Sequence, residues 1–387
     1  MRIAAWRPAV RAVGTNTLAS GLAALVALVG NVLISRQLGP SARGEVAFVL
    51  QLSYLVMPFL LLGVDRQNLR SDSRQDNTRP TRHLVPVTAF VTVVLLGFFQ
   101  DWRALAPVIA LTLSWLAIRR SQSLRDHSFA HYVRAFVTYQ VFVAGCTILL
   151  FLNGNDDWHW WLLPYALPSV IVLFTETGKN WRVRPREIFG HVNKASLQLL
   201  PSTIATLVVM RGDRLLMPAL ASNTQLGLYA AVATATEMIY WVAQSLADHR
   251  VSRLSSRRSI PALVRSLVVD AMMFALVATL VAALIFAILL PLLGPQFAPA
   301  RDLVLPLSMA AVVLAIYRQF IAWHLGGPRP ETVSFIEVTT AFFALPCYWF
   351  AILSGGAQGA AWSSLGVYGF GVTLSLITAL RQRKRLE

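Results

Sequence analysis

The sequence predicts an all-α membrane protein, because of its composition, its apolar runs and the placement of its charges. Of the 387 residues, 56% are hydrophobic and 13% are charged, whereas soluble domains carry about 25% charged residues. The apolar residues gather in runs of roughly 20, the length of a helix that crosses about 30 Å of hydrocarbon. No long polar stretch remains for a separate soluble domain.

About twelve transmembrane helices are expected from these runs. They lie at residues 13–34, 45–64, 84–100, 104–118, 135–152, 160–176, 195–216, 227–247, 266–292, 302–323, 332–353 and 357–380. The first run follows Arg2, Arg7 and Arg11, which resembles a signal peptide. It continues to Ile34 without a small-residue cleavage pattern, so we interpret it as a membrane helix.

Charge placement predicts the orientation of the helices. The net charge is +16, and most Lys and Arg residues fall in alternate loops. The positive-inside rule then places both termini and the basic loops in the cytoplasm of a multi-pass protein of the cell (plasma or inner) membrane. A soluble protein with this charge would suggest nucleic acid. Here no basic patch interleaved with aromatic residues is found in the sequence, so no nucleic-acid partner is expected.

Two basic connections stand out among the predicted cytoplasmic loops, at residues 65–83 and 177–194. Each can anchor the chain to anionic lipids or dock a cytoplasmic biosynthetic enzyme. The second lies at the midpoint of the chain. It predicts an N-terminal six-helix lobe (1–178), a cytoplasmic linker (179–194) and a C-terminal six-helix lobe (195–387).

A weak internal repeat agrees with this division. The predicted loop that begins at Leu38 and the loop that begins at Ala221 both join an outward-going helix to an inward-going one. An offset of 183 residues aligns Gly44 with Gly227. Two halves of the same orientation, related by an axis along the membrane normal, are a common plan among transporters.

Four short motifs follow one another along the chain. They are Leu38-Gly39-Pro40 with Gly44 and Ala47; Arg211-Gly212-Asp213 with Leu226-Gly227-Leu228-Tyr229-Ala230; Leu293-Gly294-Pro295-Gln296-Phe297; and Tyr317-Arg318-Gln319-Phe320 with Leu325-Gly326-Gly327-Pro328. In this order on twelve predicted helices, they resemble the polysaccharide-biosynthesis, O-antigen-type flippase family. The resemblance spans almost the whole chain.

This resemblance implies membership of the multidrug/oligosaccharidyl-lipid/polysaccharide exporter superfamily. It implies two six-helix lobes around a central cavity. The implied function is alternating access that moves a lipid-linked oligosaccharide or polysaccharide unit from the inner to the outer leaflet. Such a flippase is no enzyme and has no catalytic residue. It needs polar side chains for a sugar-phosphate head, and arginine forks suit phosphate oxygens.

Charged side chains inside apolar runs are costly and are therefore candidates for the substrate site or a gate. Arg211, Asp213 and Arg214 end the seventh run, and Glu237 lies within the eighth. Arg214 can share the helix face of Arg211, which is the candidate partner of Glu237. Two interpretations remain open: structural anchoring and ion pairing, or substrate contact and an outer gate. Glu237 is also a candidate proton- or cation-coupling group.

Further candidates lie in the eighth and tenth runs. Tyr240 and Trp241 either stack on a sugar or pack between helices. Arg318 either snorkels to the inner interface or contacts a phosphate that enters from the cytoplasm, as the family resemblance implies. Asp270 and Glu337 are its candidate counter-ions.

Uncharged polar residues in the first lobe, among them Asn31, are expected to form interhelical hydrogen bonds. Neither a cofactor nor a metal site is expected, because Cys146 and Cys347 lie in apolar runs without metal-ligand spacing. The expected partners are a lipid-linked glycan, membrane lipids, and H+ or Na+ as coupling ion. Cytoplasmic or membrane enzymes of polysaccharide assembly are further candidates.

Two other functions stay open. One is a cation-coupled drug or metabolite antiporter of the same superfamily, which favours carboxylates in the first lobe, although this lobe lacks embedded acidic residues between its first and fifth helices. The other is a membrane polymerase or ligase of polysaccharide assembly. Such enzymes need a large outer loop with catalytic residues, and the predicted outer loops are short.

Overall fold

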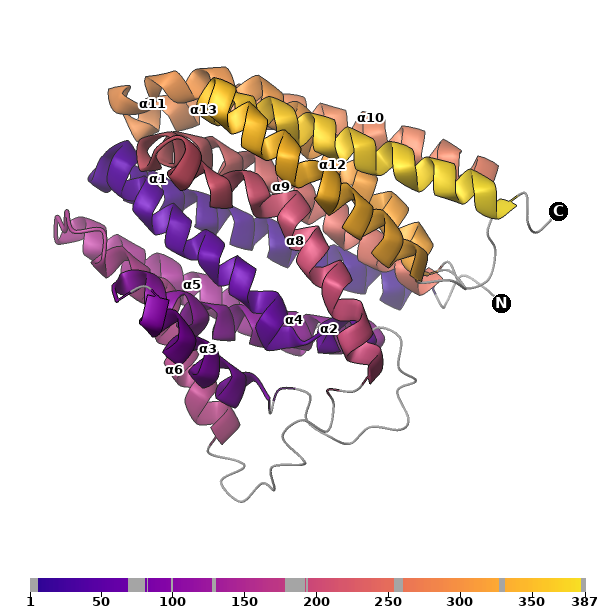
Figure 1. The fold of residues 1–387 in the computed structure, drawn as a ribbon, viewed down its shortest axis with the longest axis horizontal. Coiled ribbons are helices and arrows are strands. Elements are labelled where there is room, and N and C mark those ends of the chain that lie inside the picture. Colours follow the sequence, from indigo (N-terminus) through magenta and orange to yellow (C-terminus); the bar gives the residue numbers. More distant parts are fainter. Residues whose placement is uncertain are drawn as a thin grey trace. The chain divides into compact units, whose positions relative to one another are not determined.

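The computed structural model describes residues 6–68, 81, 83–98, 100–126, 130–177, 192, 194–253, 260–326 and 331–383. Most of these residues are helical, and none of them belongs to a strand (Figure 1). Seven helices are long and apolar enough to cross a membrane, and two shorter apolar helices cover residues 84–97 and 160–174. The composition of the helices thus indicates a multi-pass membrane protein.

The helices overlap the predicted apolar runs, and two long helices each cover two of these runs. They are α1 (Trp6–Leu61), α2 (Val64–Asn68), α3 (Leu84–Phe98), α4 (Ala106–Arg125), α5 (Ala130–Leu152), α6 (Leu163–Thr177), α8 (Lys194–Leu220), α9 (Asn223–Arg253), α10 (Ile260–Leu284), α11 (Leu290–Leu293), α12 (Val304–Leu325) and α13 (Glu331–Arg383). A π-helical turn at Ile285–Leu289 joins α10 to α11, and 3-10 helices cover Trp102–Leu105, Trp160–Leu162 and Pro295–Leu303. The count of twelve membrane spans and the cytoplasmic placement of the termini remain predictions.

Two of the predicted loops are wrong. The chain is helical on both sides of Gly39, the single non-helical residue within α1 (φ 71°, ψ 177°). In α13 the single break is Gly356 (φ 54°, ψ −134°). Glycine adopts such positive φ angles at little cost because it lacks a Cβ atom. Pro40 then starts the next arm, where its missing N–H costs nothing. In each of these two helices, a single glycine therefore makes the bend where a loop was predicted.

Packing divides the chain into two compact units. One contains residues 1–44 and 208–387, and the other contains residues 45–207. The boundaries fall inside α1 and α8, so one part of each of these helices belongs to one unit and the remaining part to the other. Most of the predicted linker, residues 179–194, lies outside the described residues. The division into six-helix lobes on either side of that linker stays a prediction.

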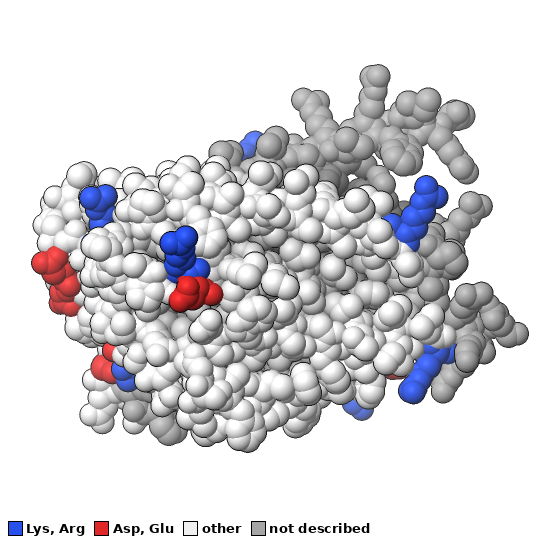
Figure 2. Space-filling model, turned by 90° about the horizontal axis from the view of Figure 1, so that it is seen from above, with Lys and Arg blue, Asp and Glu red and all other residues white. Residues whose placement is uncertain are grey.

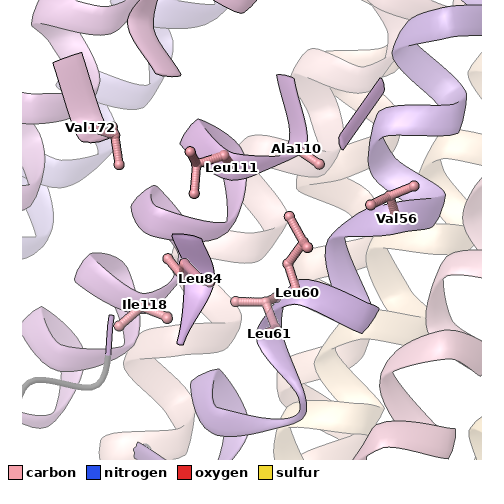
Figure 3. Packing of buried hydrophobic residues seen from close by; sticks show 8 residues of the cluster. All are labelled: Val56, Leu60, Leu61, Leu84, Ala110, Leu111, Ile118 and Val172. Carbon is pink, nitrogen blue, oxygen red and sulfur yellow. The ribbon is translucent and has the colours of Figure 1, made fainter. Parts of the chain in front are cut away.

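In the unit of residues 45–207, α4 packs against α2, α3, α5 and α6. Figure 3 shows the core at this place. Its buried side chains come from the second arm of α1, from α3, α4 and α6, and are Val56, Leu60, Leu61, Leu84, Ala110, Leu111, Ile118 and Val172. Tight packing of these aliphatic groups holds the helices of this unit together.

In the unit of residues 1–44 and 208–387, α12 packs against α9, α10 and α13 (Figure 1). Small residues line these contacts: Ala243 of α9, Ala278 of α10, and Ala311 and Ala315 of α12 belong to one buried cluster around Phe274. Alanines at helix interfaces let the backbones approach closely, as in other membrane helix bundles.

Large apolar side chains are exposed on both units. Phe90 and Phe174 are each 70% exposed in one unit, and Met272 (71%) and Phe342 (74%) in the other. On the face shown in Figure 2, acidic and basic side chains are few and wide areas carry none. Such surfaces are unfavourable in water but suit a lipid environment, which agrees with the apolar helices.

Candidate functional site

Two arginines of α8 converge on one carboxylate of α9. Arg211 Nη1 lies 2.9 Å from Glu237 Oε1, and Arg214 Nη1 lies 2.5 Å from the same oxygen. The expected pairing of Arg211 with Glu237 is thus present. Both arginines reach Glu237 because residues three apart share a helix face. The side chains are 12% (Arg211), 9% (Arg214) and 23% (Glu237) exposed, so the group is largely enclosed.

Asp213 makes different contacts from its neighbours. Its carboxylate accepts hydrogen bonds from the hydroxyl groups of Tyr229 on α9 and Ser364 on α13, the latter at 3.1 Å. It is 1% exposed. The guanidinium of Arg214 lies 5.6 Å from the centre of the Tyr229 ring. Asp213 therefore connects α8 to α9 and α13. Arg211, Arg214 and Glu237 form a separate cluster of ion pairs between α8 and α9.

A second polar group lies further along the same face of α9. Glu237, Tyr240, Trp241 and Gln244 follow the spacing of a single helix face. Tyr240 donates to Gln244 Oε1 at 2.9 Å, and its ring meets that of Trp241 edge-on at 6.2 Å. Arg318 of α12 donates to the same amide oxygen through Nε (3.1 Å) and Nη2 (2.9 Å).

The charge of Arg318 has a buried counter-ion. Glu337 of α13 is fully buried, and its Oε1 lies 4.0 Å from Arg318 Nη1. Asp270 of α10 is also buried, 7% exposed, and remains a candidate. The guanidinium of Arg318 lies 5.9 Å from the centre of the Tyr240 ring. Arg318 is therefore held inside the helix packing by an amide, a ring and a carboxylate.

The internal repeat corresponds to a direct contact. A Cβ atom on Gly44 would lie 1.8 Å from the carbonyl oxygen of Asn223, and one on Gly227 would lie 1.8 Å from that of Pro40. The offset of 183 residues that aligns Gly44 with Gly227 also aligns Pro40 with Asn223. The second arm of α1 and the start of α9 therefore cross in a reciprocal contact that only glycine permits.

A buried hydrogen-bond brace lies beside this crossing. Asn31 donates through Nδ2 to the carbonyl of Ala231 at 3.0 Å, and its Oδ1 accepts from Arg43 Nε (3.2 Å) and Nη2 (2.9 Å). The interhelical bonding expected of Asn31 is present. The role of Arg43 was missed, because the sequence shows it only as a charge within a predicted loop. Its place next to a glycine of the repeat was the available signal.

Arg66 was also missed, since it begins the basic connection predicted at residues 65–83. The structure places it in α2, where it donates to the hydroxyl groups of Ser202 and of Thr206, the latter at 2.8 Å. These hydroxyls lie four residues apart on α8 and thus on one face. Arg66 therefore holds the first part of α8 within the unit of residues 45–207. Most of the remaining connection lies outside the described residues.

No group of three or more His, Cys, Asp or Glu side chains that could hold a metal is found among the described residues. The polar groups of the site instead comprise paired cations, carboxylates, an amide and two aromatic rings. They offer hydrogen-bond donors and charge, and no arrangement of nucleophile and base among them was identified.

The fold is similar to that of several solved structures. A multidrug resistance MATE family transporter of the MOP superfamily, in its inward-facing conformation, matches with a TM-score of 0.64 at 12% identity, over 94% of this chain and 96% of that one. The lipid II flippase MurJ, in an inward closed conformation, matches with a TM-score of 0.63 at 14% identity, over 94% and 87%.

The chain has the fold of these transporters. An outward-facing conformation of a MATE transporter of the MOP superfamily also matches, with a TM-score of 0.59 at 12% identity over 97% of both chains. No family model and no curated protein matches the sequence. The transporter fold implied by the sequence motifs is therefore confirmed, while membership of the O-antigen-type flippase family stays a prediction.

Proposed function

We propose that this chain is a membrane transporter that flips a lipid-linked oligosaccharide or polysaccharide unit from the inner to the outer leaflet. The observation that carries the proposal is the pair Arg211 and Arg214, enclosed on a largely apolar helix of a MOP-type fold. Buried cations in a membrane helix suit a substrate with a negative head. The polyprenyl-linked glycans of this class carry phosphate groups.

The surrounding groups fit such a head in two parts. Arg211, Arg214 and Arg318 offer guanidinium forks to phosphate oxygens. Tyr240 and Trp241 lie on α9 between Glu237, the partner of Arg211 and Arg214, and Gln244, the partner of Arg318. Their ring faces can stack on a sugar. The crossing of Gly44 and Gly227 falls on the predicted outer side, which agrees with a role of these segments in an outer rim or gate.

A second candidate is a cation-coupled drug or metabolite antiporter. The neighbouring MATE structures favour it, and so do the buried carboxylates Asp213 and Glu337, which would suit a cationic substrate or a coupling ion. Against it, Asp213 is engaged by two hydroxyls and Glu237 by two arginines. An anionic substrate therefore fits the charges of the cluster better.

A sided assay in vesicles tests the proposal. The purified protein is reconstituted with a polyprenyl-pyrophosphate-linked oligosaccharide that carries a fluorophore on its sugar. A membrane-impermeant reductant then bleaches the fluorophores of the outer leaflet. We expect the protein to expose the inner-leaflet pool to the reductant, whereas protein-free vesicles keep it protected. Equal protection in both would contradict the proposal, and uptake of a cationic dye driven by a proton gradient would favour the antiporter.

A further inference from the structure

We propose that the carboxylate of Glu237 occupies the position of a substrate phosphate, so that an anionic head and this side chain compete for Arg211 and Arg214. This inference rests on the proposed function, because it concerns how the same site receives its substrate. The ligand it implies is a phosphate-bearing group, such as a pyrophosphate.

The geometry of the cluster matches that of a bound anion. Both guanidinium groups point at a single oxygen, Glu237 Oε1, and Arg211 Nη2 reaches the second oxygen at 3.4 Å. Planar arginine forks recognise carboxylate and phosphate oxygens with the same donor geometry. A phosphate can therefore take over the contacts that the carboxylate makes.

The charge balance allows this exchange. Asp213 lies against Arg214, from whose backbone N–H it accepts a hydrogen bond at 2.8 Å, and it stays bound to Tyr229 and Ser364. Glu237 balances the other arginine. Loss of Glu237 alone would leave a positive charge uncompensated inside an apolar helix bundle, which is costly. A single phosphodiester group carries one negative charge, so one such group that enters as Glu237 leaves keeps the cluster balanced.

Glu237 is also the most exposed member of the cluster. Its side chain is 23% exposed, against 12% for Arg211 and 9% for Arg214. Arg214 is further fixed by its contact with the Tyr229 ring. In the proposed exchange the two arginines stay in place, and the carboxylate rotates away toward its exposed side.

Calorimetric titration of the purified protein with inorganic pyrophosphate tests the exchange. Glu237→Gln keeps the shape of the side chain but removes the competing charge, so we expect pyrophosphate to bind about tenfold more tightly than to the wild type, as for a charge-assisted contact. Glu331→Gln removes the same charge from an exposed position at the start of α13 and should leave the affinity unchanged.

A second probe distinguishes a free phosphate from a lipid headgroup. A short isoprenyl pyrophosphate in the same detergent carries the same two phosphates on a lipid chain. A gain in affinity for both probes in Glu237→Gln assigns the site to the phosphate group alone. A gain only for the isoprenyl probe assigns it to a lipid headgroup. No gain for either probe would overturn the inference.

Arg211→Lys is a second variant for the same titration, in case Glu237→Gln does not fold. This variant retains the charge but replaces the fork with a single ammonium group, so pyrophosphate should bind several-fold more weakly than to the wild type. Unchanged affinity in this variant would also overturn the exchange. If the protein flips the glycan but these affinity changes are absent, the proposed function is supported and only the exchange at Glu237 is contradicted. If the affinity changes are observed but the glycan is not flipped, the exchange is supported and the substrate is another phosphate-bearing molecule.

Discussion

Gly44 and Gly227 make the same contact in opposite directions. Each glycine faces the carbonyl oxygen of a residue that lies four positions before the other glycine: Gly44 faces Asn223, and Gly227 faces Pro40. The offset of 183 residues converts one contact into the other. A local two-fold relationship between the two repeats is therefore built into the crossing of α1 and α9.

Gly227→Ala is expected to destabilise this crossing. The new Cβ atom would lie 1.8 Å from the Pro40 carbonyl oxygen, and this oxygen belongs to a backbone that cannot rotate away. Forced shifts of this kind typically cost about 1–3 kcal/mol. Thermal unfolding of the purified protein should show a lower midpoint, and Gly44→Ala should behave alike.

Gly366→Ala is the matched control for this prediction. Gly366 also lies within a helix, but nothing lies within 4 Å of its Cβ position. Alanine stabilises a helix interior by about 0.5–1 kcal/mol relative to glycine, so the midpoint should stay or rise. A Gly227→Ala protein as stable as Gly366→Ala would show that the crossing does not need glycine.

Asn31→Ala should weaken the brace beside the crossing. The substitution removes the donor to the Ala231 carbonyl and the acceptor of two Arg43 hydrogen bonds. Loss of partners for buried polar groups costs about 1–3 kcal/mol, more for a charged group. Asn31→Asp keeps the acceptor and adds a charge opposite Arg43, so it should lose less stability. Equal unfolding midpoints for Asn31→Ala and the wild type would contradict the brace.

Tyr229→Phe tests whether Asp213 is held as a charged acceptor. Removal of the phenol leaves the buried carboxylate with one hydrogen-bond donor fewer, and bonds to charged groups contribute about 1.5–3 kcal/mol. In an Asp213→Asn background the same substitution should cost less, because a neutral amide binds the hydroxyl more weakly. A double-mutant cycle on the free energy of unfolding measures this difference. A coupling near zero would show that the hydrogen bond between Tyr229 and Asp213 contributes nothing to stability.

The helices could be predicted from the sequence because their signal is local. Runs of about 20 apolar residues suffice to predict a membrane helix, and the predicted runs overlap the helices of the structure. The pairing of Arg211 with Glu237 was also accessible, since buried charges on successive helices need partners. The bends at Gly39 and Gly356 were missed because a glycine break looks like a loop in the sequence.

The contacts between distant segments could not be predicted. The repeat aligned Gly44 with Gly227, but only the fold shows which carbonyl each one meets. The contacts of Arg66 with Ser202 and Thr206 join residues that lie more than a hundred positions apart, and no local pattern indicates them. Gln244 was missed for the same reason, since its partner Arg318 comes from another helix.

Arg211→Ala tests the central claim that the α8–α9 cluster receives the anionic head of a lipid-linked glycan. The measured quantity is the rate at which labelled glycan becomes accessible to the impermeant reductant in vesicles. The matched control is Arg301→Ala, an exposed arginine beside the ring of Phe286. The account predicts a rate at least about tenfold lower for Arg211→Ala, the loss of one charge-assisted phosphate contact, and an unchanged rate for Arg301→Ala. Wild-type rates for Arg211→Ala, in protein that is folded and inserted, would contradict it.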